Sequence, residues 1–412
     1  MVNQRQRRAV SFYLLVSWLV SGVGLFLSLW IVVPAPTFTL LPLGVGAPEI
    51  SPWLLGLNGL GLLLAGKGGI GLPAQSACRH QTLRIALGLS LIGLLLSALP
   101  LSQFAATNRR ADAAMVQVFG SGYRADIPTN SVPLRSQPFV LLDALRGIRD
   151  RPVRHTPGIV FAQPDGIPLS LEVSRPPQVG VYPALIVIHG GAWQSGSPSD
   201  YANFSRYMAA QGYVVWAIAY RLAPRYQFPA QLQDVKTALA FIQTHAAEYE
   251  TDPTRMALLG RSAGAQLALL AAYDPAAPPL KAVVSYYGPV DLTAGYYDLP
   301  QPDPINTRAV LRTFLGGTPV ELGDRYRAAS PLNFVTRPLP PSLLVYGDRD
   351  HIVLAKFGRR LATQLQRVGS PVVYLEIPWA EHAFDTIIHG VSNQLTLYYT
   401  ERFLALTLKN RR

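Results

Sequence analysis

The sequence predicts an α/β fold: a mainly parallel eight-stranded sheet with helices on both faces, preceded by an all-α transmembrane region. Two observations lead to this prediction. The first hundred residues contain three apolar stretches and a single acidic residue. From about residue 158, short apolar runs typical of buried strands alternate with segments whose apolar residues recur every three or four positions, as in helices that cover a sheet.

Charge is distributed unevenly along the chain. The 412 residues carry a net charge of +12, and 15% of them are charged, whereas soluble domains usually contain about a quarter. Residues 1–110 contribute +7 of this charge, with Glu49 as their only acid. We therefore attribute the basic balance to membrane-flanking segments and expect no nucleic-acid partner, since the sequence has no zinc spacing or basic patch interleaved with aromatic residues. The single cysteine, Cys78, excludes an internal disulfide and a four-cysteine metal site.

Residues 1–106 form the predicted membrane region, with about three transmembrane helices. The first apolar stretch is long enough to cross a hydrocarbon core of about 30 Å. Arginines precede it, as in a signal peptide, but it is longer than a signal core and no clean cleavage site follows. The middle stretch is short and rich in glycine, so a re-entrant or interfacial segment is its alternative. The stretches are residues 11–33, 50–66 and 85–104.

The basic residues of the short loops predict the orientation. The N-terminus is basic, loop 34–49 has no Lys or Arg, and loop 67–84 carries Lys67, Arg79 and Arg84. This pattern places the N-terminus and the second loop in the cytoplasm. We expect an integral protein of the cytoplasmic membrane, in contact with its lipids, whose chain after about residue 106 lies on the extracytoplasmic side.

Residues 107–157 are predicted to be a connector that contains an amphipathic helix at 138–148. Residues 158–412 form the α/β domain, and two hairpin-like strands at its start make the sheet mixed. The expected strands are 158–162, 169–173, 184–189, 213–219, 256–260, 282–287, 342–347 and 372–377, and the expected helices are 232–242, 263–273, 353–368 and 391–406.

A G-x-S-x-G motif lies where a predicted strand meets a predicted helix. It is Gly260-Arg261-Ser262-Ala263-Gly264. A serine hydroxyl is a weak nucleophile unless a base removes its proton. A tight strand-to-helix turn lifts the serine Oγ out of the sheet, the glycines permit the strained backbone, and the helix N-terminus favours negative charge. The motif in this setting predicts Ser262 as the nucleophile of a serine hydrolase.

A second buried strand ends in the run His189-Gly190-Gly191-Ala192-Trp193. An oxyanion is stabilised by backbone N–H groups that reach it without side chains in the way, and glycines at a strand end allow this. We expect a structural role for His189, while Trp193 either lines the pocket or packs beneath it. The predicted oxyanion-hole residues are Gly190, Gly191, Ala192 and Ala263, with Gly190 shaping the turn and the other three donating.

Three motifs together resemble a known family. Over residues 158–408 the chain is similar to the hormone-sensitive-lipase-like and feruloyl-esterase/acetylxylan-esterase-like branch of the α/β-hydrolases. Hormone-sensitive-lipase-like esterases usually have a third glycine where this chain has Ala192, and Ala192 followed by Trp193 leans toward the feruloyl-esterase and kynurenine-formamidase-like relatives. The motifs are His189–Trp193, Tyr220–Pro224 followed by Phe228-Pro229-Ala230, and Gly260–Gly264.

The resemblance implies that an acid and then a histidine follow the nucleophile along the chain. The resemblance favours Asp350, three residues after the glycine that ends strand 342–347, as the acid. Asp348 is the alternative acid; if it does not have this role, we expect it to cap the turn.

Three histidines lie downstream of Ser262. His382 follows strand 372–377, where the base of this fold belongs, whereas His351 adjoins Asp350 in sequence and is poorly placed to pair with it, and His389 is expected at the surface. In this arrangement Asp350 orients His382, which deprotonates Ser262 and later protonates the leaving alcohol.

A cap-like insertion is expected at about 288–340, because over fifty residues separate two predicted strands and an insertion of this length is typical of an active-site cover. Four tyrosines could bind an aromatic or sugar face, or simply pack. The sequence has no metal-ligand spacing and no phosphate-binding loop, so we expect neither metal nor cofactor. The tyrosines are Tyr286, Tyr287, Tyr296 and Tyr297.

The sequence therefore favours a membrane-anchored serine carboxylic-ester hydrolase whose substrate is a small-molecule, glycan or lipid ester. An amidase or peptidase of the same fold is one alternative. A non-catalytic, membrane-tethered binding module is another, although the complete set of Ser262, Asp350 and His382 argues against it. The oligomeric state is not predictable from these residues.

Overall fold

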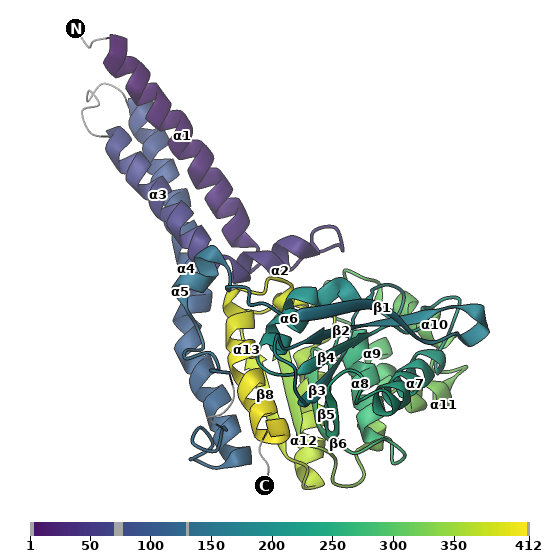
Figure 1. The fold of residues 1–412 in the computed structure, drawn as a ribbon. Helices are drawn as coiled ribbons and strands as arrows, with labels where there is room; N and C mark the ends of the chain where they lie inside the picture. The colour runs from purple at the N-terminus through teal and green to yellow at the C-terminus, as the bar shows by residue number, and fades with distance from the viewer. Residues whose placement is uncertain (1–3, 70–76, 129–131, 410–412) are drawn as a thin grey trace.

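The computed structural model describes residues 4–69, 77–128 and 132–409. It has two parts, a slender bundle of three helices near the N-terminus and an α/β domain at one end of that bundle (Figure 1). The bundle helices are α1 (Gln4–Leu29), α3 (Ser51–Gly69) and the first half of α4 (Ala77–Phe119), and the short α2 (Leu41–Glu49) joins α1 to α3.

The α/β domain is built on one eight-stranded sheet of order β1-β2-β4-β3-β5-β6-β7-β8. The first two strands pair antiparallel, β2 also pairs antiparallel with β4, and all other neighbours are parallel. The predicted mixed, mainly parallel sheet is therefore confirmed. The strands are β1 (Arg154–Ala162), β2 (Leu169–Arg175), β3 (Tyr182–Ile188), β4 (Val214–Ile218), β5 (Thr251–Arg261), β6 (Leu280–Tyr286), β7 (Ser342–Gly347) and β8 (Val372–Ile377).

Helices cover both faces of the sheet. Figure 1 shows α7 and α8 on one side and α13 on the other, with the second half of α4 beside α13. The helices that follow the bundle are α5 (Leu141–Arg146), α6 (Ala202–Ala210), α7 (Ala230–Thr244), α8 (Ala263–Tyr273), α9 (Leu292–Tyr297), α10 (Thr307–Leu315), α11 (Gly323–Ala328), α12 (Ala355–Arg367) and α13 (Val391–Leu404).

The sequence placed each strand but not every boundary. Residues 107–119, predicted to belong to the connector, are the last turns of α4 and bury Ala111 and Met115 in the core of the α/β domain. Strand β1 begins at Arg154, four residues before the predicted start, where the Arg154 guanidinium pairs with Glu250. The helix predicted over 391–406 ends as an α-helix at Leu404 and continues as a single π-turn.

The three bundle helices bury mainly small and polar side chains, together with Leu54 and Leu83, and expose most of their large apolar ones. Each buried seam follows the alternating three- and four-residue spacing of closely packed helices. By length and composition, two of the described helices, α1 and α4, could cross a membrane. The middle predicted stretch forms the 19-residue helix α3, which packs against both. The seam residues are Ser17, Ser21, Gly24 and Ser28 of α1, Leu54, Asn58, Gly61 and Ala65 of α3, and Leu83, Ala86, Ser90, Gly93 and Ser97 of α4.

Candidate active site

Ser262 lies on the sharp turn between β5 and α8. Its φ of 51° and ψ of −121° are rarely adopted by residues other than glycine, so the surrounding fold must hold it in place. The Ser262 N–H donates to the Tyr286 carbonyl at 2.9 Å. A Cβ on Gly260 would lie 2.2 Å from the Gly264 carbonyl oxygen, so the turn closes only because this position is glycine.

The structure brings Ser262, His382 and Asp350 together from three loops at the carboxyl ends of parallel strands. His382 Nε2 lies 2.9 Å from Ser262 Oγ, and His382 Nδ1 lies 2.8 Å from Asp350 Oδ2. His382 and Asp350 are both buried, whereas Ser262 is partly exposed to the pocket. Asp350 Oδ1 also accepts the backbone N–H groups of Ile352 and Val353, at 2.8 and 2.7 Å. This geometry lets the carboxylate hold one imidazole tautomer and orientation.

The alternative acid and bases lie elsewhere. Asp348 is half exposed and pairs with Arg359. His351 Nδ1 lies 2.6 Å from Glu381 Oε2, and this bond raises the pKa of His351 above its ordinary value although burial opposes the shift. His389 is partly buried, its ring makes no hydrogen bond with the residues that the structure describes, and its carbonyl accepts from Gln394.

Glu381 is a further buried acid beside this site that the sequence did not single out. One of its oxygens accepts the backbone N–H groups of His351 at 2.7 Å and of His382 at 2.9 Å. Because these two residues lie on different loops, Glu381 ties the loop of Asp350 to the loop of His382.

The predicted oxyanion strand, β3, ends directly beside the nucleophile turn. A Cβ on Gly264 would lie 2.3 Å from the His189 carbonyl, so α8 begins in direct contact with the strand end. Gly191 and Ala192 both have positive φ, 107° and 53°. None of the loop, turn and cap hydrogen bonds among the described residues uses the N–H of Gly191, Ala192 or Ala263 as donor. Ala192 and Ala263 line the same pocket as Ser262.

The two aromatic residues of this loop hold its shape. His189 Nδ1 lies 2.7 Å from the Gly190 carbonyl, and its ring stacks on Tyr220 with centroids 4.3 Å apart. Burial lowers the pKa of His189, which suits the expected structural role. Trp193 satisfies both of its interpretations: it lines the pocket, and its ring stacks on Phe314 at 4.0 Å.

A buried ion pair lies under the nucleophile turn. The Arg261 guanidinium pairs with Asp385 and lies over the ring of Tyr201 at 4.0 Å. Burial opposes the charge of Arg261, but Asp385 holds its pKa above the ordinary value. The Tyr287 hydroxyl also donates to Asp385, and the Tyr287 ring lies 4.5 Å from that of His382. The only sequence signal for this network was an arginine next to the nucleophile, at the end of a buried strand.

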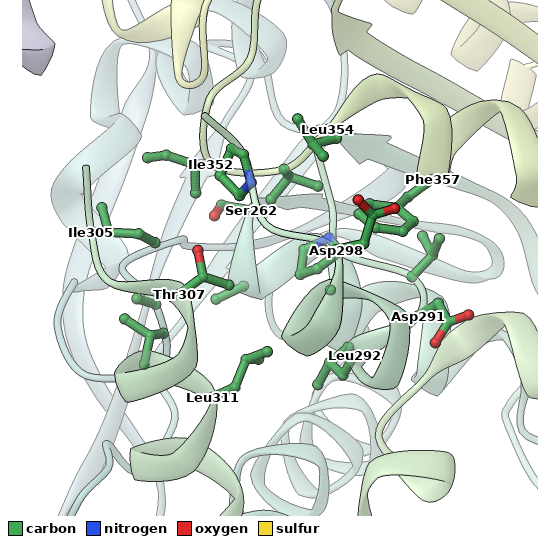
Figure 2. A pocket seen from close by; sticks show the side chains of 18 of the residues that line it. Ser262, Asp291, Leu292, Asp298, Ile305, Thr307, Leu311, Ile352, Leu354 and Phe357 are labelled. Atoms are coloured by element: carbon green, nitrogen blue, oxygen red, sulfur yellow. The ribbon is translucent and has the colours of Figure 1, made fainter. Parts of the chain in front are cut away.

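The pocket beside Ser262 is apolar, and residues 289–311, within the predicted cap, supply much of its wall (Figure 2). Of the four tyrosines considered above, Tyr286 and Tyr287 are fully buried, and neither Tyr296 nor Tyr297 lines this pocket. Figure 2 shows Ile352, Leu354 and Phe357 on one side and Ile305, Leu311 and Leu292 of the cap on another. Besides Trp193, Ala192 and Ala263, the apolar side chains include Val290, Leu292, Ile305, Val310, Leu311, Ile352, Val353, Leu354 and Phe357.

The fold and this site define the class of protein, an α/β-hydrolase with a serine nucleophile. Comparison with known proteins agrees with this class. A family model described as BD-FAE matches residues 171–365. An esterase structure from Rhizomucor miehei has the same fold, with a TM-score of 0.57 and 23% identity, and the match covers 72% of this chain and 98% of that one.

Two curated relatives from Mycobacterium tuberculosis match most of the chain. The probable carboxylic ester hydrolase LipM is 30% identical over 389 residues, with 87% of each chain covered. The esterase LipQ is 32% identical over 71% of this chain and 76% of its own. The chain therefore belongs to the α/β-hydrolase family of carboxylic ester hydrolases. Because residues 158–412 make up less than two thirds of the chain, the match to LipM must extend into the N-terminal region.

Proposed function

We propose that the protein is a membrane-anchored serine carboxylic-ester hydrolase with Ser262 as nucleophile, His382 as general base and Asp350 as the acid that orients it. The observation that carries the proposal is the hydrogen-bonded chain from Ser262 Oγ through both nitrogens of His382 to Asp350, at the edge of an apolar pocket. The relatives' names, carboxylic ester hydrolase and esterase, favour an ester over an amide as the bond cleaved.

The reaction proceeds through an acyl-enzyme. His382 Nε2 takes the proton of Ser262 Oγ as the oxygen attacks the ester carbonyl, and Asp350 stabilises the imidazolium at Nδ1. The N–H groups of Gly191, Ala192 and Ala263 bind the oxyanion, while Gly190 shapes the turn. Collapse of this intermediate releases the alcohol, which carries away the proton from His382. A water, deprotonated by His382, then attacks the acyl-enzyme, releases the carboxylic acid and restores Ser262.

A fluorophosphonate probe tests this proposal directly, because it labels only an activated serine. We expect the wild-type protein to be labelled and to hydrolyse p-nitrophenyl esters, and Ser262→Ala to do neither. The matched control is Ser285→Ala, since Ser285 is a buried serine one strand away from the nucleophile turn. An unlabelled wild type, or equal labelling of Ser262→Ala, would refute the hydrolase.

Residues 1–106 are proposed to anchor the enzyme in the cytoplasmic membrane through three helices, α1, α3 and α4. Their large apolar side chains point outward; Leu15, Leu19 and Leu63, for example, are 65–72% exposed. Bilayer lipids would cover this surface, and in lipid small and polar residues are the preferred contacts between helices. Inside the bundle Asn58 donates to Ser28 Oγ at 3.0 Å, and Ser90 donates to Ser21 Oγ at 2.7 Å.

The proposed orientation has the N-terminus in the cytoplasm and the α/β domain outside. It rests on the basic residues at the N-terminus and in loop 67–84, against none in loop 34–49. We expect the protein to resist carbonate extraction from membranes. A C-terminal alkaline phosphatase fusion should be active and a C-terminal reporter that works only in the cytoplasm should be silent; the reverse result would contradict this orientation.

A further inference from the structure

The bundle is attached to the α/β domain at the carboxyl ends of the parallel strands, where Ser262, His382 and Asp350 lie, and we call this end the catalytic face. The Arg349 guanidinium, one residue before Asp350, donates to the Val32 carbonyl just beyond α1. Trp379, three residues before His382, packs against Phe104 of α4 with ring centroids 6.1 Å apart. The loops that carry the acid and the base therefore both contact the membrane region.

Helix α2 makes a third contact on the same face. Glu49 Oε2 accepts the backbone N–H of Ser392 at 2.8 Å, at the start of α13. A Cβ on Gly390 would lie 2.3 Å from the same oxygen, so the end of α2 and the segment that follows the His382 loop are in close contact. Figure 1 shows α2 lying across the end of the α/β domain, at the base of the bundle.

Residues 30–48, which connect α1 to the end of α2 and which we call the uncharged segment, contain no charged residue. Val33 is 44% exposed and Phe38 is 68% exposed. Exposed apolar side chains beside the end of a membrane helix suit the boundary between lipid and water. The catalytic face would then lie against the bilayer surface.

The pocket wall belongs to the same loop as the contact with Val32. Ile352, Val353 and Leu354 line the pocket, within five residues of Arg349. A lipophilic group leaving the bilayer at the uncharged segment would therefore reach an apolar surface close by.

The polar side chains of the cap that line the pocket are already engaged within the protein. Asp291 caps α9 and pairs with Arg360, Asp298 pairs with Lys356, and the Thr307 hydroxyl donates to Asp303. A sugar would bring many hydroxyl groups into this pocket and leave them without partners, at a cost in free energy. The lining thus favours an apolar substrate over a glycan ester.

We infer that the substrate is a lipophilic ester dissolved in the bilayer, which enters the pocket from the membrane surface beside the uncharged segment. This inference rests on the proposed esterase function and specifies its substrate class. The bond cleaved and the products, a carboxylic acid and an alcohol, are those of the reaction above.

The test uses the full-length protein reconstituted in phosphatidylcholine vesicles. 4-Methylumbelliferyl oleate serves as the bilayer ester and p-nitrophenyl acetate as the water-soluble ester. At constant bulk ester and enzyme, diluting the oleate ester about tenfold with additional lipid should lower its subsaturating rate about tenfold, because the enzyme responds to the concentration within the membrane. The rate on p-nitrophenyl acetate should not change.

A matched pair of variants tests the entry route. Phe38→Asp places a charge on the uncharged segment and should lower the rate on the bilayer ester about fivefold, with p-nitrophenyl acetate hydrolysis unchanged. Val179→Asp is the control, because Val179 is 82% exposed but precedes β3, at the end of the sheet opposite the catalytic face. It should change neither rate.

Failure of this inference can be told apart from failure of the esterase. If the rate on the oleate ester does not fall on lipid dilution, or is unchanged in Phe38→Asp, entry from the bilayer is overturned. Continued hydrolysis of p-nitrophenyl acetate would show that the esterase function itself still holds. Loss of both activities in the wild type, together with no fluorophosphonate labelling, would overturn the proposed function itself.

Discussion

Asp350 serves both the base and the backbone of its own loop, since one oxygen meets His382 and the other accepts two backbone N–H groups. Asp350→Asn preserves the size of the side chain but offers an amide in place of a charge, so it favours the wrong imidazole tautomer. We expect kcat on p-nitrophenyl butyrate to fall about 10⁴-fold with little change in KM. Asp348→Asn, which removes only a half-exposed ion pair, should stay within about twofold. Equal losses in the two variants would contradict the assignment of Asp350.

The ion pair of Arg261 with Asp385 is nearly inaccessible to solvent, with both side chains 1% exposed. Asp385→Asn leaves the guanidinium buried without a counter-charge, which should destabilise the fold by about 3–5 kcal/mol. In detergent this corresponds to a fall of about 10 °C in Tm. Adding Arg261→Met removes the unpaired buried charge and should restore part of the lost stability. A double variant no more stable than Asp385→Asn would argue against the pair.

The sequence could point to Ser262, His382 and Asp350, the proposed nucleophile, base and acid, because each follows the end of a strand in an order characteristic of the fold. It could not point to Asp385, which meets Arg261 across 124 residues of chain. Glu381 was equally hidden, since its role depends on two loops whose separation only the folded sheet sets. A local sequence pattern can indicate that a loop at the end of a strand carries a functional residue, but it cannot indicate which loops are in contact in the folded protein.

Glu49, the last residue of α2, links this helix to the first turn of α13. Burial raises the pKa of its carboxyl to about 8. The folded state holds this proton more tightly than the unfolded chain does. Protonation of Glu49 therefore stabilises the folded state fully below about pH 4.5, and this stabilisation is lost as pH rises toward 8. The loss is at most about 1.4 kcal/mol per pH unit.

Glu49→Gln should therefore flatten the pH dependence of Tm between pH 5 and 9, as measured by thermal unfolding in detergent, since the amide cannot ionise. The gain over the wild type should appear only at the alkaline end. Glu248→Gln, at an exposed glutamate of the α7–β5 loop, is the control and should leave the wild-type slope unchanged. A slope in Glu49→Gln as steep as that of the wild type would exclude Glu49 as its source.

Helix α9 of the cap offers a direct probe of the pocket. Gly295 lines the pocket, and a Cβ added there would meet nothing within 4 Å. Because the added Cβ has open space around it, Gly295→Leu should place its side chain in the pocket and lower kcat/KM for p-nitrophenyl octanoate about tenfold relative to the acetate. Gly323→Leu makes the same change in α11, also in open space but away from the pocket lining. Similar chain-length profiles for the two variants would place the acyl chain elsewhere.

The elements themselves were largely predictable because their signals are local. Strands β7 and β8 and helix α8 have the predicted boundaries, since bounded apolar runs and helical spacing reflect constraints within the segment. Boundaries failed where distant residues extend an element, as at Arg154 of β1, whose partner Glu250 lies 96 residues away. The continuation of α4 past residue 107 likewise depends on burial of Ala111 and Met115 against the α/β domain.

The whole molecule combines two opposite patterns of polarity. The α/β domain buries its apolar side chains, whereas the bundle exposes them and buries small and polar ones. The spacing of those small residues is visible in the sequence. Mean hydropathy, however, averages them with their apolar neighbours and so does not show which face of each helix packs inside the bundle. Two of the contacts that join the two parts, Glu49 with Ser392 and Val32 with Arg349, link residues over 300 positions apart and leave no local pattern.

The bundle seam can be tested with two glycines of one helix. A Cβ on Gly61 would lie 2.3 Å from Ser90 Oγ and 3.3 Å from Ser21 Oγ, whereas a Cβ on Gly56 would meet nothing within 4 Å. Gly61→Leu should therefore push α3 away from both partners and cost about 1–3 kcal/mol or more. Gly56→Leu adds the same side chain to the outer surface, where lipid receives it without strain. We expect only Gly61→Leu to lower Tm in detergent and to increase protease cleavage between the bundle and the α/β domain. Equal effects would mean that the helices do not pack along this seam, and that the catalytic face is not held at the membrane by it.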